Sequence, residues 1–162
     1  MREKIKTREE LKSLVAQLKS GGKHIVLTNG CFDILHVGHI RYLAEAKTYG
    51  DHLIVAINSD SSVRAIKGEG RPLVPQDERA EVVAALQCVD SVVIFDELNP
   101  LNIIEMFKPH VLVKGGDWTE ETIIGADVVN THGGEVISLP FVKGASTSSI
   151  MERIIQRYGR SR

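Results

Sequence analysis

The chain has 162 residues, of which 43% are hydrophobic and 25% charged, so it is long enough to bury the core of one globular domain. Its 20 Lys and Arg residues balance 21 Asp and Glu residues, which argues against general binding to nucleic acid. The first fifteen residues lack the apolar core of a signal peptide, and no run approaches the roughly eighteen apolar residues of a membrane span. We therefore expect a cytoplasmic protein with neither a nucleic acid nor a membrane as partner.

Apolar, strand-like runs alternate with helical periodicity along the chain. A capping-box pattern of Thr7 with Glu10 predicts a first helix to about Lys19, and we interpret residues 1–22 as a helical extension of a single domain, 1–162. Strands are predicted at about 25–29, 53–58, 91–95, 111–114 and 135–139, and helices near 38–49, 60–67, 76–87, 99–108, 120–131 and 147–157. This order predicts an α/β fold, a doubly wound, Rossmann-like parallel sheet of five strands, with ligands at the carboxyl ends of the strands.

The decapeptide GCFDILHVGH, residues 30–39, joins the first predicted strand to the next helix. His36 and His39 are three residues apart, so on a helix their rings face the same space. A helix that opens directly off a strand also attracts phosphate through its unpaired N–H groups and its dipole. The pair therefore indicates phosphoryl chemistry. Two other interpretations remain open: each histidine is a helix cap or a satisfied core residue, or the two are metal ligands together with Cys31 or Asp33.

Cysteine usage gives no metal signature. Cys31 and Cys88 are the two cysteines, and they fit no paired metal-ligand spacing. We therefore predict free thiols and no metal held by protein side chains alone.

Basic side chains surround the Gly- and Pro-rich stretch that follows the second predicted strand. Asn58 and Asp60 stand at the carboxyl end of that strand, where α/β enzymes keep ligand contacts. A cluster of Arg and Lys suits a phosphorylated second substrate, although a solvated basic loop is the alternative. The residues predicted to bind this substrate are Asn58, Asp60, Arg64, Lys67, Arg71 and Arg79.

Two later segments offer further phosphate contacts. Lys114 ends the fourth strand beside Gly115 and either projects toward a phosphate or lies on the surface. Asp117 either holds a ribose or an Mg²⁺-bound water, or caps the next helix. The hydroxyl groups of Ser146 and Thr147 either cap the last helix or cradle a phosphate at its N-terminus.

The decapeptide resembles the signature of nucleotidyltransferases of the cytidylyltransferase type, Gly-x-Phe-Asp-x-x-His-x-Gly-His. The resemblance implies that the two histidines contact the triphosphate and stabilise charge on the phosphorus under attack. It also implies that Gly38 leaves room for the nucleotide and that the turn at 30–33 covers the phosphates. The predicted catalytic residues are His36, His39 and Lys114. The predicted nucleotide-binding residues are Gly30, Cys31, Phe32, Asp33, Gly38, Gly115, Asp117, Ser146 and Thr147.

From GRPLVPQDERAEVV onward, the chain is similar to the branch of this family that converts heptose 1-phosphate to ADP-heptose. The likeness implies transfer of AMP from ATP to D-glycero-β-D-manno-heptose 1-phosphate with Mg²⁺, for lipopolysaccharide or other surface glycans. In many bacteria this activity is the C-terminal half of a bifunctional kinase–adenylyltransferase. Because 162 residues leave no room for a kinase domain, the likeness implies a stand-alone form whose sugar 1-phosphate comes from a separate sugar kinase. It also implies a homodimer.

The chain also departs from glycerol-phosphate cytidylyltransferases. Those relatives carry Arg-Thr-x-Gly-Ile-Ser-Thr before the last helix, whereas this chain reads FVKGAST, so that either Lys114 or Lys143 replaces the missing charge. Gly116 stands where those relatives tend to have a second Asp. Two alternative functions stay open, a cytidylyltransferase acting on a polyol phosphate such as glycerol 3-phosphate, and a non-catalytic nucleotide-binding regulatory module.

Overall fold

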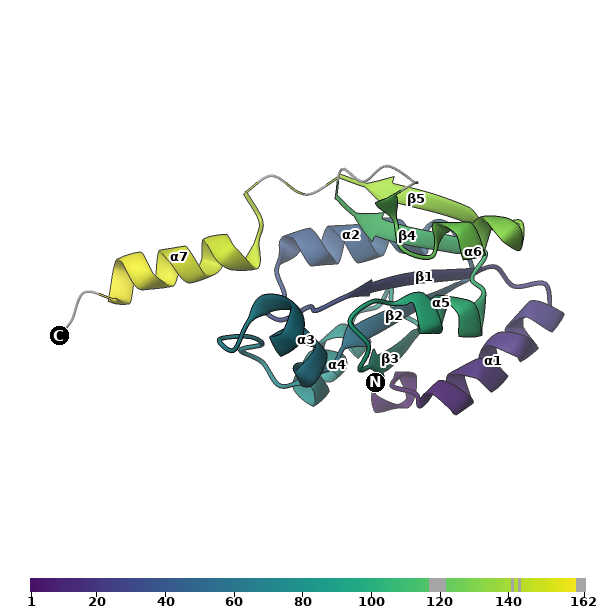
Figure 1. Cartoon of the computed structure of the whole chain (residues 1–162), viewed down its shortest axis with the longest axis horizontal. Helices are drawn as coiled ribbons and strands as arrows, with labels where there is room; N and C mark the ends of the chain where they lie inside the picture. The colour runs from purple at the N-terminus through teal and green to yellow at the C-terminus, as the bar shows by residue number, and fades with distance from the viewer. Residues whose placement is uncertain (117–121, 141, 143, 160–162) are drawn as a thin grey trace.

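A computed structural model describes residues 1–116, 122–140, 142 and 144–159. Its centre is a parallel sheet in the order β3-β2-β1-β4-β5, which confirms the predicted five-stranded doubly wound fold (Figure 1). The strands are β1 (Ile25–Gly30), β2 (His52–Asn58), β3 (Ser91–Phe95), β4 (Val111–Gly115) and β5 (Glu135–Leu139). The helices are η1 (Arg2–Lys4), α1 (Arg8–Ser20), α2 (Val37–Lys47), α3 (Asp60–Lys67), α4 (Gln76–Ala84), α5 (Leu101–Phe107), α6 (Ala126–Thr131) and α7 (Thr147–Tyr158).

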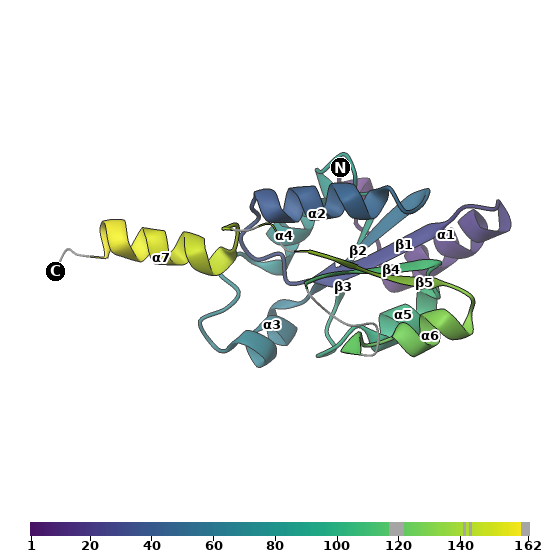
Figure 2. The same ribbon diagram turned by 90° about the horizontal axis from the view of Figure 1, so that it is seen from above.

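Helices cover both faces of the sheet, with α2 and α4 on one face and α1, α5 and α6 on the other (Figure 2). Neighbouring strand residues point to opposite faces, so Val26 packs under α2 and α4 whereas Ile25 and Leu27 pack under α1 and α5. All three side chains are fully buried. The two apolar layers therefore fix the register of β1, and with it the position of the turn that follows.

The strand order reverses at β1, which pairs with β2 on one side and β4 on the other. In such a sheet the loops after the two central strands diverge and leave a crevice at their carboxyl ends. The segment that leaves β1 toward α2 contains the signature decapeptide. The sheet therefore delivers this segment to the position where the fold class predicts a ligand.

Helix α6 begins later than the sequence predicts. The expected range was 120–131, but α6 starts at Ala126, and residues 117–121 lie outside the described part of the chain. Gly125 has a φ of +88°, which an α-helix does not contain, and a Cβ there would come within 2.5 Å of Ile104 Cδ1. The close approach of α5 therefore sets the start of α6, and helical periodicity gave no sign of it.

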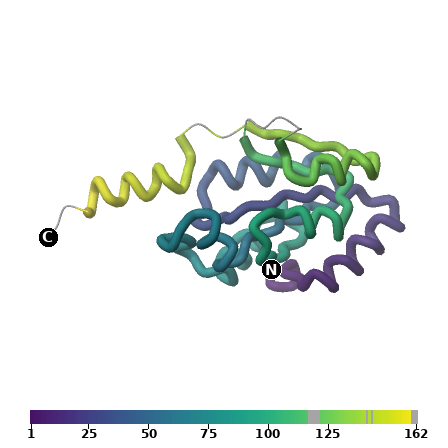
Figure 3. The backbone as a smooth tube through the Cα atoms, in the orientation of Figure 1, coloured from purple at the N-terminus to yellow at the C-terminus, as the bar shows by residue number. Residues whose placement is uncertain are grey.

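The two terminal helices differ in their packing. Leu11 and Val15 of α1 are buried against the sheet and α5, so the segment predicted as an extension is part of the core. Helix α7 stands away from the sheet and has no buried residue (Figures 1 and 3). Among the described residues no helix combines the length and hydrophobicity that a membrane span requires.

Candidate active site

A cavity of about 770 Å³ lies at the carboxyl ends of β1 and β4, between the start of α2 and the segment that leads into α7. Its volume is in the range of small-molecule sites. Eight residues predicted from the sequence line it, namely Phe32, His36, Gly38, His39, Lys67, Gly115, Ser146 and Thr147. The structure therefore brings together segments that are more than a hundred residues apart in the chain.

The two signature histidines stack on each other in this cavity, with ring centroids 3.9 Å apart and an interplanar angle of 25°. His36 is the N-cap of α2, and its Nδ1 accepts the backbone N–H of Gly38 at 3.1 Å. A neutral His36 ring therefore carries its proton on Nε2. Nδ1 of His39 is buried and has no hydrogen-bond partner among the described residues.

Burial controls the charge of both rings. It lowers the pKa of His36 below its ordinary value, and burial together with repulsion from His36 lowers the pKa of His39 to about 4. Both imidazoles are therefore neutral near pH 7 in the ligand-free protein. In that state they act as N–H donors, and an incoming anion raises their pKa by favouring the protonated form.

The turn that carries the signature is strained at Phe32. Its φ of +47° lies in the left-handed region, which non-glycine residues adopt rarely. The Phe32 ring packs over Gly30, where a Cβ would meet it at 3.0 Å, and it lies 5.2 Å from the His39 ring. At Gly38 a Cβ would come within 2.9 Å of the His36 ring. The glycines of the signature therefore allow Phe32, His36 and His39 to pack closely.

Lys114 does not line the cavity itself but bonds to a residue that does. Its Nζ donates to Oδ1 of Asn29, which lines the cavity, and burial lowers the pKa of Lys114 to about 8. Because few groups offset the desolvation of its ammonium group, Lys114 gains from a bound anion. Asn29 was missed by the sequence analysis, although its place at the end of β1 was a usable signal.

Tyr42 was also missed, because its position on α2 predicts packing rather than a site. Its hydroxyl donates to the carbonyl of Val113 at 3.0 Å and therefore accepts from Thr28 Oγ1 at 2.6 Å. Burial raises the pKa of Tyr42 to about 12. Tyr42 thus forms a fixed, neutral part of the cavity wall and links β1 to β4.

A second, more polar cavity of about 350 Å³ adjoins the first. Both cavities are lined by Phe32, His39, Lys67 and Thr147, which mark their junction. The remaining residues of the smaller cavity are Cys31, Asp33, Arg71 and Ser148. Lys67 and Arg71 outnumber the one carboxylate, so the smaller cavity favours an anion.

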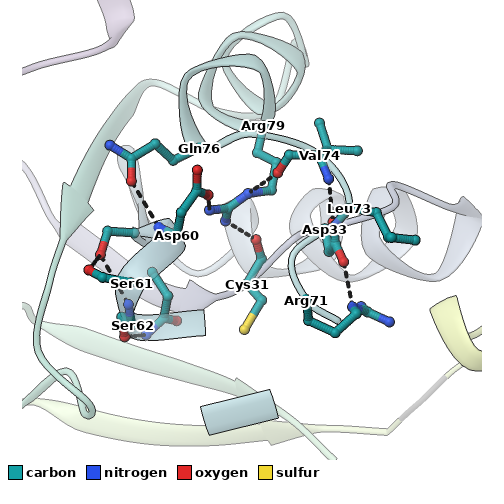
Figure 4. A network of polar contacts seen from close by, with 12 residues as sticks. Cys31, Asp33, Asp60, Ser61, Ser62, Arg71, Leu73, Val74, Gln76 and Arg79 are labelled. Atoms are coloured by element: carbon teal, nitrogen blue, oxygen red, sulfur yellow. Dashed lines mark hydrogen bonds and ion pairs between the residues drawn. The ribbon is translucent and has the colours of Figure 1, made fainter. Parts of the chain in front are cut away.

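Asp33 contacts residues 71–74, in the loop between α3 and α4 (Figure 4). One carboxylate oxygen accepts the backbone N–H groups of Leu73 and Val74 at 2.8 and 2.9 Å, and the other lies 2.6 Å from Nε of Arg71. The side chain of Asp33 is 1% exposed. Asp33 therefore ties the signature turn to residues 71–74, and its contact with a nucleotide stays a prediction.

Arg79 occupies a different place from the predicted substrate contact. Its side chain is fully buried and lines neither cavity. Its guanidinium donates to the carbonyls of Val74 and Cys31 and to Oδ1 of Asp60, and the ion pair with Asp60 is 2.8 Å long (Figure 4). These contacts involve all three guanidinium nitrogens. Arg79 therefore holds segments that surround the smaller cavity and does not line the cavity itself.

The other predicted residues that the structure describes line neither cavity. Asn58 is buried and donates to Ser62 Oγ at 3.0 Å, which ties β2 to α3. Asp60 pairs with Arg79, and Arg64 is exposed on α3. Gly30 lies under the Phe32 ring. Asp117 and Lys143 fall outside the described residues.

Ser146 and Thr147 form the wall of the cavity at the start of α7. Ser146 Oγ accepts the N–H of Ser149 at 3.0 Å, and Ser149 completes a capping box. Thr147 Oγ1 donates to the carbonyl of Ile34 at 3.4 Å, which joins α7 to the signature segment. Both interpretations of the Ser146 hydroxyl are compatible with the structure, because Ser146 caps α7 and also lines the cavity together with Thr147.

Comparisons with known proteins agree with this geometry. Residues 27–153 match the model of a family described as cytidylyltransferase-like. The chain is 54% identical over 156 residues to the bifunctional protein HldE of Geobacter metallireducens and 51% identical over 156 residues to that of Geobacter sulfurreducens. Each alignment covers 96% of this chain and 32% of the relative, so the chain spans about a third of the length of these relatives.

A solved structure is similar as well. The crystal structure of the lipopolysaccharide core biosynthesis protein from Thermoplasma volcanium aligns with a TM-score of 0.60 and 30% identity, over 76% of this chain and 100% of that one. The family model covers most of the chain, including the signature turn, both histidines and the start of α7. The chain therefore belongs to the cytidylyltransferase-like family, and it is a nucleotidyltransferase.

Proposed function

We propose that this nucleotidyltransferase transfers AMP from ATP to D-glycero-β-D-manno-heptose 1-phosphate and releases pyrophosphate. The observation that carries the proposal is 54% identity, over 96% of the chain, to a bifunctional HldE protein. The likeness of residues 70–118, 123–129 and 133–154 to heptose 1-phosphate adenylyltransferases supports the same acceptor. The similarity to a lipopolysaccharide core biosynthesis protein agrees with a product used for surface glycans.

The reaction needs no protein nucleophile. An oxygen of the sugar phosphate attacks the α-phosphorus of ATP and forms a new P–O bond, while the bond to the β-phosphate bridge breaks and pyrophosphate leaves with the electron pair. The attacking oxygen is already anionic near neutral pH, so no base has to remove a proton. The protein must instead hold two anions together and stabilise the charge of the transition state.

The residues around the larger cavity suit that task. Neutral His36 and His39 donate N–H groups, and Lys114 and Lys67 provide positive charge. The N-terminus of α2, an eleven-residue helix, adds its dipole. Two of these donors are held before substrate arrives, because His36 bonds to Gly38 and Lys114 bonds to Asn29.

Mg²⁺ is proposed to arrive with the triphosphate. The described residues contain no group of three His, Cys, Asp or Glu side chains arranged to hold a metal ion, whereas Mg²⁺ in such enzymes is commonly bound through substrate phosphates and water. Bound in this way, Mg²⁺ supplies positive charge to the phosphate oxygens. His36, His39 and Lys114 are proposed to contact oxygens that the ion leaves free.

The test measures pyrophosphate release with purified protein, Mg²⁺ and a panel of acceptors. Heptose 1-phosphate with ATP is expected to give the highest kcat/KM, and ATP is expected to exceed CTP. Glycerol 3-phosphate with CTP tests the cytidylyltransferase alternative, and nucleotide binding without turnover on any acceptor identifies a regulatory module. Equal or better turnover with CTP rejects the proposal.

Further proposals concern the setting of the reaction. We propose that a kinase active site supplies the sugar 1-phosphate, because the HldE relatives are bifunctional and three times as long as the aligned segment. We also propose that residues 1–162 form one nucleotidyltransferase domain and that the protein works in the cytoplasm as a homodimer. Light scattering coupled to size-exclusion chromatography checks the dimer.

A further inference from the structure

The loop between α3 and α4, residues 68–75, is anchored to the signature turn through Asp33. Leu73 and Val74 donate their N–H groups to one oxygen of Asp33, and Arg71 pairs with the other. Asp33 is almost completely buried, so these contacts are shielded from water. The basic loop is therefore held in a defined position.

Arg79 fixes the same loop from the opposite side. Its Nε donates to the carbonyl of Val74 at 2.9 Å, while its two terminal nitrogens donate to Cys31 and Asp60 (Figure 4). These three partners belong to the loop, the signature turn and the first residue of α3. One buried guanidinium thus sets the relative positions of three separate chain segments.

Each of the three segments contributes at least one residue to the wall of the smaller cavity. The signature turn contributes Cys31 and Asp33, helix α3 ends at Lys67, and the loop contributes Arg71. Arg79 itself lines neither cavity. The network therefore lies behind a wall that carries two cations, at the junction with the proposed nucleotide cavity.

The docking of α4 has a separate basis. Ala80, Val83 and Ala84 of this helix are buried in the apolar layer shared with α2 and the sheet. Burying a guanidinium is costly unless its donors are paired, so it adds little stability compared with an apolar side chain of similar volume. The network thus accounts for the shape of the cavity wall better than for the packing of α4.

We propose that Arg79 and Asp33 are positioning residues that hold Lys67 and Arg71 against the smaller cavity and so set the affinity for the anionic acceptor. This inference depends on the proposed function in one respect, namely that the acceptor substrate carries a phosphate. The larger cavity suits ATP, since it contains the stacked histidines, and the smaller one is less than half its volume. An acceptor phosphate held near Lys67 lies where the two cavities meet, which is where attack on the α-phosphorus has to occur.

The first test is kinetic and uses Arg79→Lys, with Arg157→Lys as the matched control, because Arg157 is exposed in the last turn of α7 and lines neither cavity. Lysine keeps the charge but cannot reach the three acceptors together. We expect the KM for the acceptor to rise about tenfold or more in Arg79→Lys, with the KM for ATP within about threefold of the wild type. Arg157→Lys should leave both unchanged. Equal changes in both KM values, or no change in either, overturn the inference.

The second test needs no turnover. Hydrogen exchange of the Leu73 and Val74 amides reports directly on the bonds to Asp33, and the amides of Val55 and Ala56 in β2 report global opening. Arg79→Lys should speed exchange at Leu73 and Val74 about tenfold or more while β2 keeps its protection. Asp33→Asn, which loses the charge paired with Arg71, should loosen the same two amides.

The two tests separate this inference from the proposed function. If heptose 1-phosphate is not a substrate, the proposed function fails, but the exchange experiment is unaffected and the kinetic one uses whichever phosphate acceptor the pyrophosphate screen identifies. The positioning role is rejected if the amides of Leu73 and Val74 exchange at the wild-type rate in both variants. It is also rejected if β2 loses protection to the same extent.

Discussion

The protein contains two stacked pairs of histidines at opposite ends of its sheet. His36 and His39 stack at 3.9 Å at the carboxyl ends of the strands, and His24 and His110 stack at 4.8 Å at the amino ends, each pair with an interplanar angle of 25°. At the amino end, Nδ1 of His110 accepts the N–H of Ile25, which starts β1. At the carboxyl end, Nδ1 of His39 has no partner among the described residues, and its ring lines both cavities.

Other polar residues follow the same division. At the amino end, Oδ2 of Asp90 accepts the N–H of Leu53 and the ammonium of Lys47, both at 2.7 Å. At the carboxyl end, the ammonium of Lys114 is buried next to the cavity, with Asn29 Oδ1 as its hydrogen-bond acceptor. The difference teaches that residue type does not separate structural from functional groups. What separates them is whether the protein already satisfies each polar atom.

The largest effect is expected at the carboxyl-end histidines. His39→Ala or His36→Ala removes a preorganised donor next to charge that grows in the transition state, so kcat should fall about 10²- to 10³-fold. Saturating steady-state kinetics measures this, with circular dichroism to confirm folding. A variant that keeps more than about half of the wild-type kcat shows that its ring is not catalytic.

Lys114 should produce the next largest effect. Replacing it by Met removes a charge-assisted contact worth about 1.5–3 kcal/mol, which is about tenfold to a hundredfold in kcat/KM for ATP. Because burial lowers the pKa of Lys114 to about 8, the wild-type kcat/KM should fall above that pH as the free enzyme loses the ammonium proton.

Lys114→Arg provides the control for this pH dependence. Arginine stays charged throughout the accessible pH range, so the decline above about pH 8 should disappear in that variant. A decline that persists unchanged assigns the titration to another group.

Asp90 tests the amino end of the sheet. Asp90→Ala leaves the N–H of Leu53 and the ammonium of Lys47 without this acceptor, and should lower the free energy of unfolding by about 1.5–3 kcal/mol. Its kcat should equal that of the wild type, because Asp90 lies at the opposite end of the sheet from both cavities. Urea unfolding measures the stability, and a loss of kcat in a folded variant breaks the comparison between the two ends.

Sequence patterns were sufficient for the five strands and the doubly wound parallel sheet, since alternating apolar runs and helical periods permit few parallel arrangements. The signature also predicted His36, His39 and Gly38 correctly as neighbours in one cavity. Arg79 shows the limit of this approach. A basic residue beside a basic loop predicts a phosphate contact, but Arg79 instead donates to the nearby carbonyl of Val74 and to the carbonyl of Cys31, which is 48 residues away in the chain. Backbone acceptors leave no trace in sequence. Asn29 and Tyr42 were missed for other reasons, since the position of Asn29 at the end of β1 was not used and the position of Tyr42 on α2 predicts packing.

The smallest effect is expected at His110. Replacing it by Ala removes the acceptor for the N–H of Ile25 and should cost about 0.5–1.5 kcal/mol near pH 7.5 without changing kcat. Burial, together with the charges of Lys19 and His24, lowers the pKa of His110, so the folded protein disfavours the protonated ring that the unfolded chain accepts. Wild-type stability should therefore fall as the pH drops below about 6.5, the ordinary histidine value, because protonation of Nδ1 removes the acceptor. His110→Ala lacks this contribution, so the stability difference between the two proteins should shrink as the pH falls. Thermal unfolding at pH 7.5 and pH 5.5 measures it, and a difference that stays constant or grows on acidification excludes His110 as a neutral acceptor and removes the contrast between the two histidine pairs.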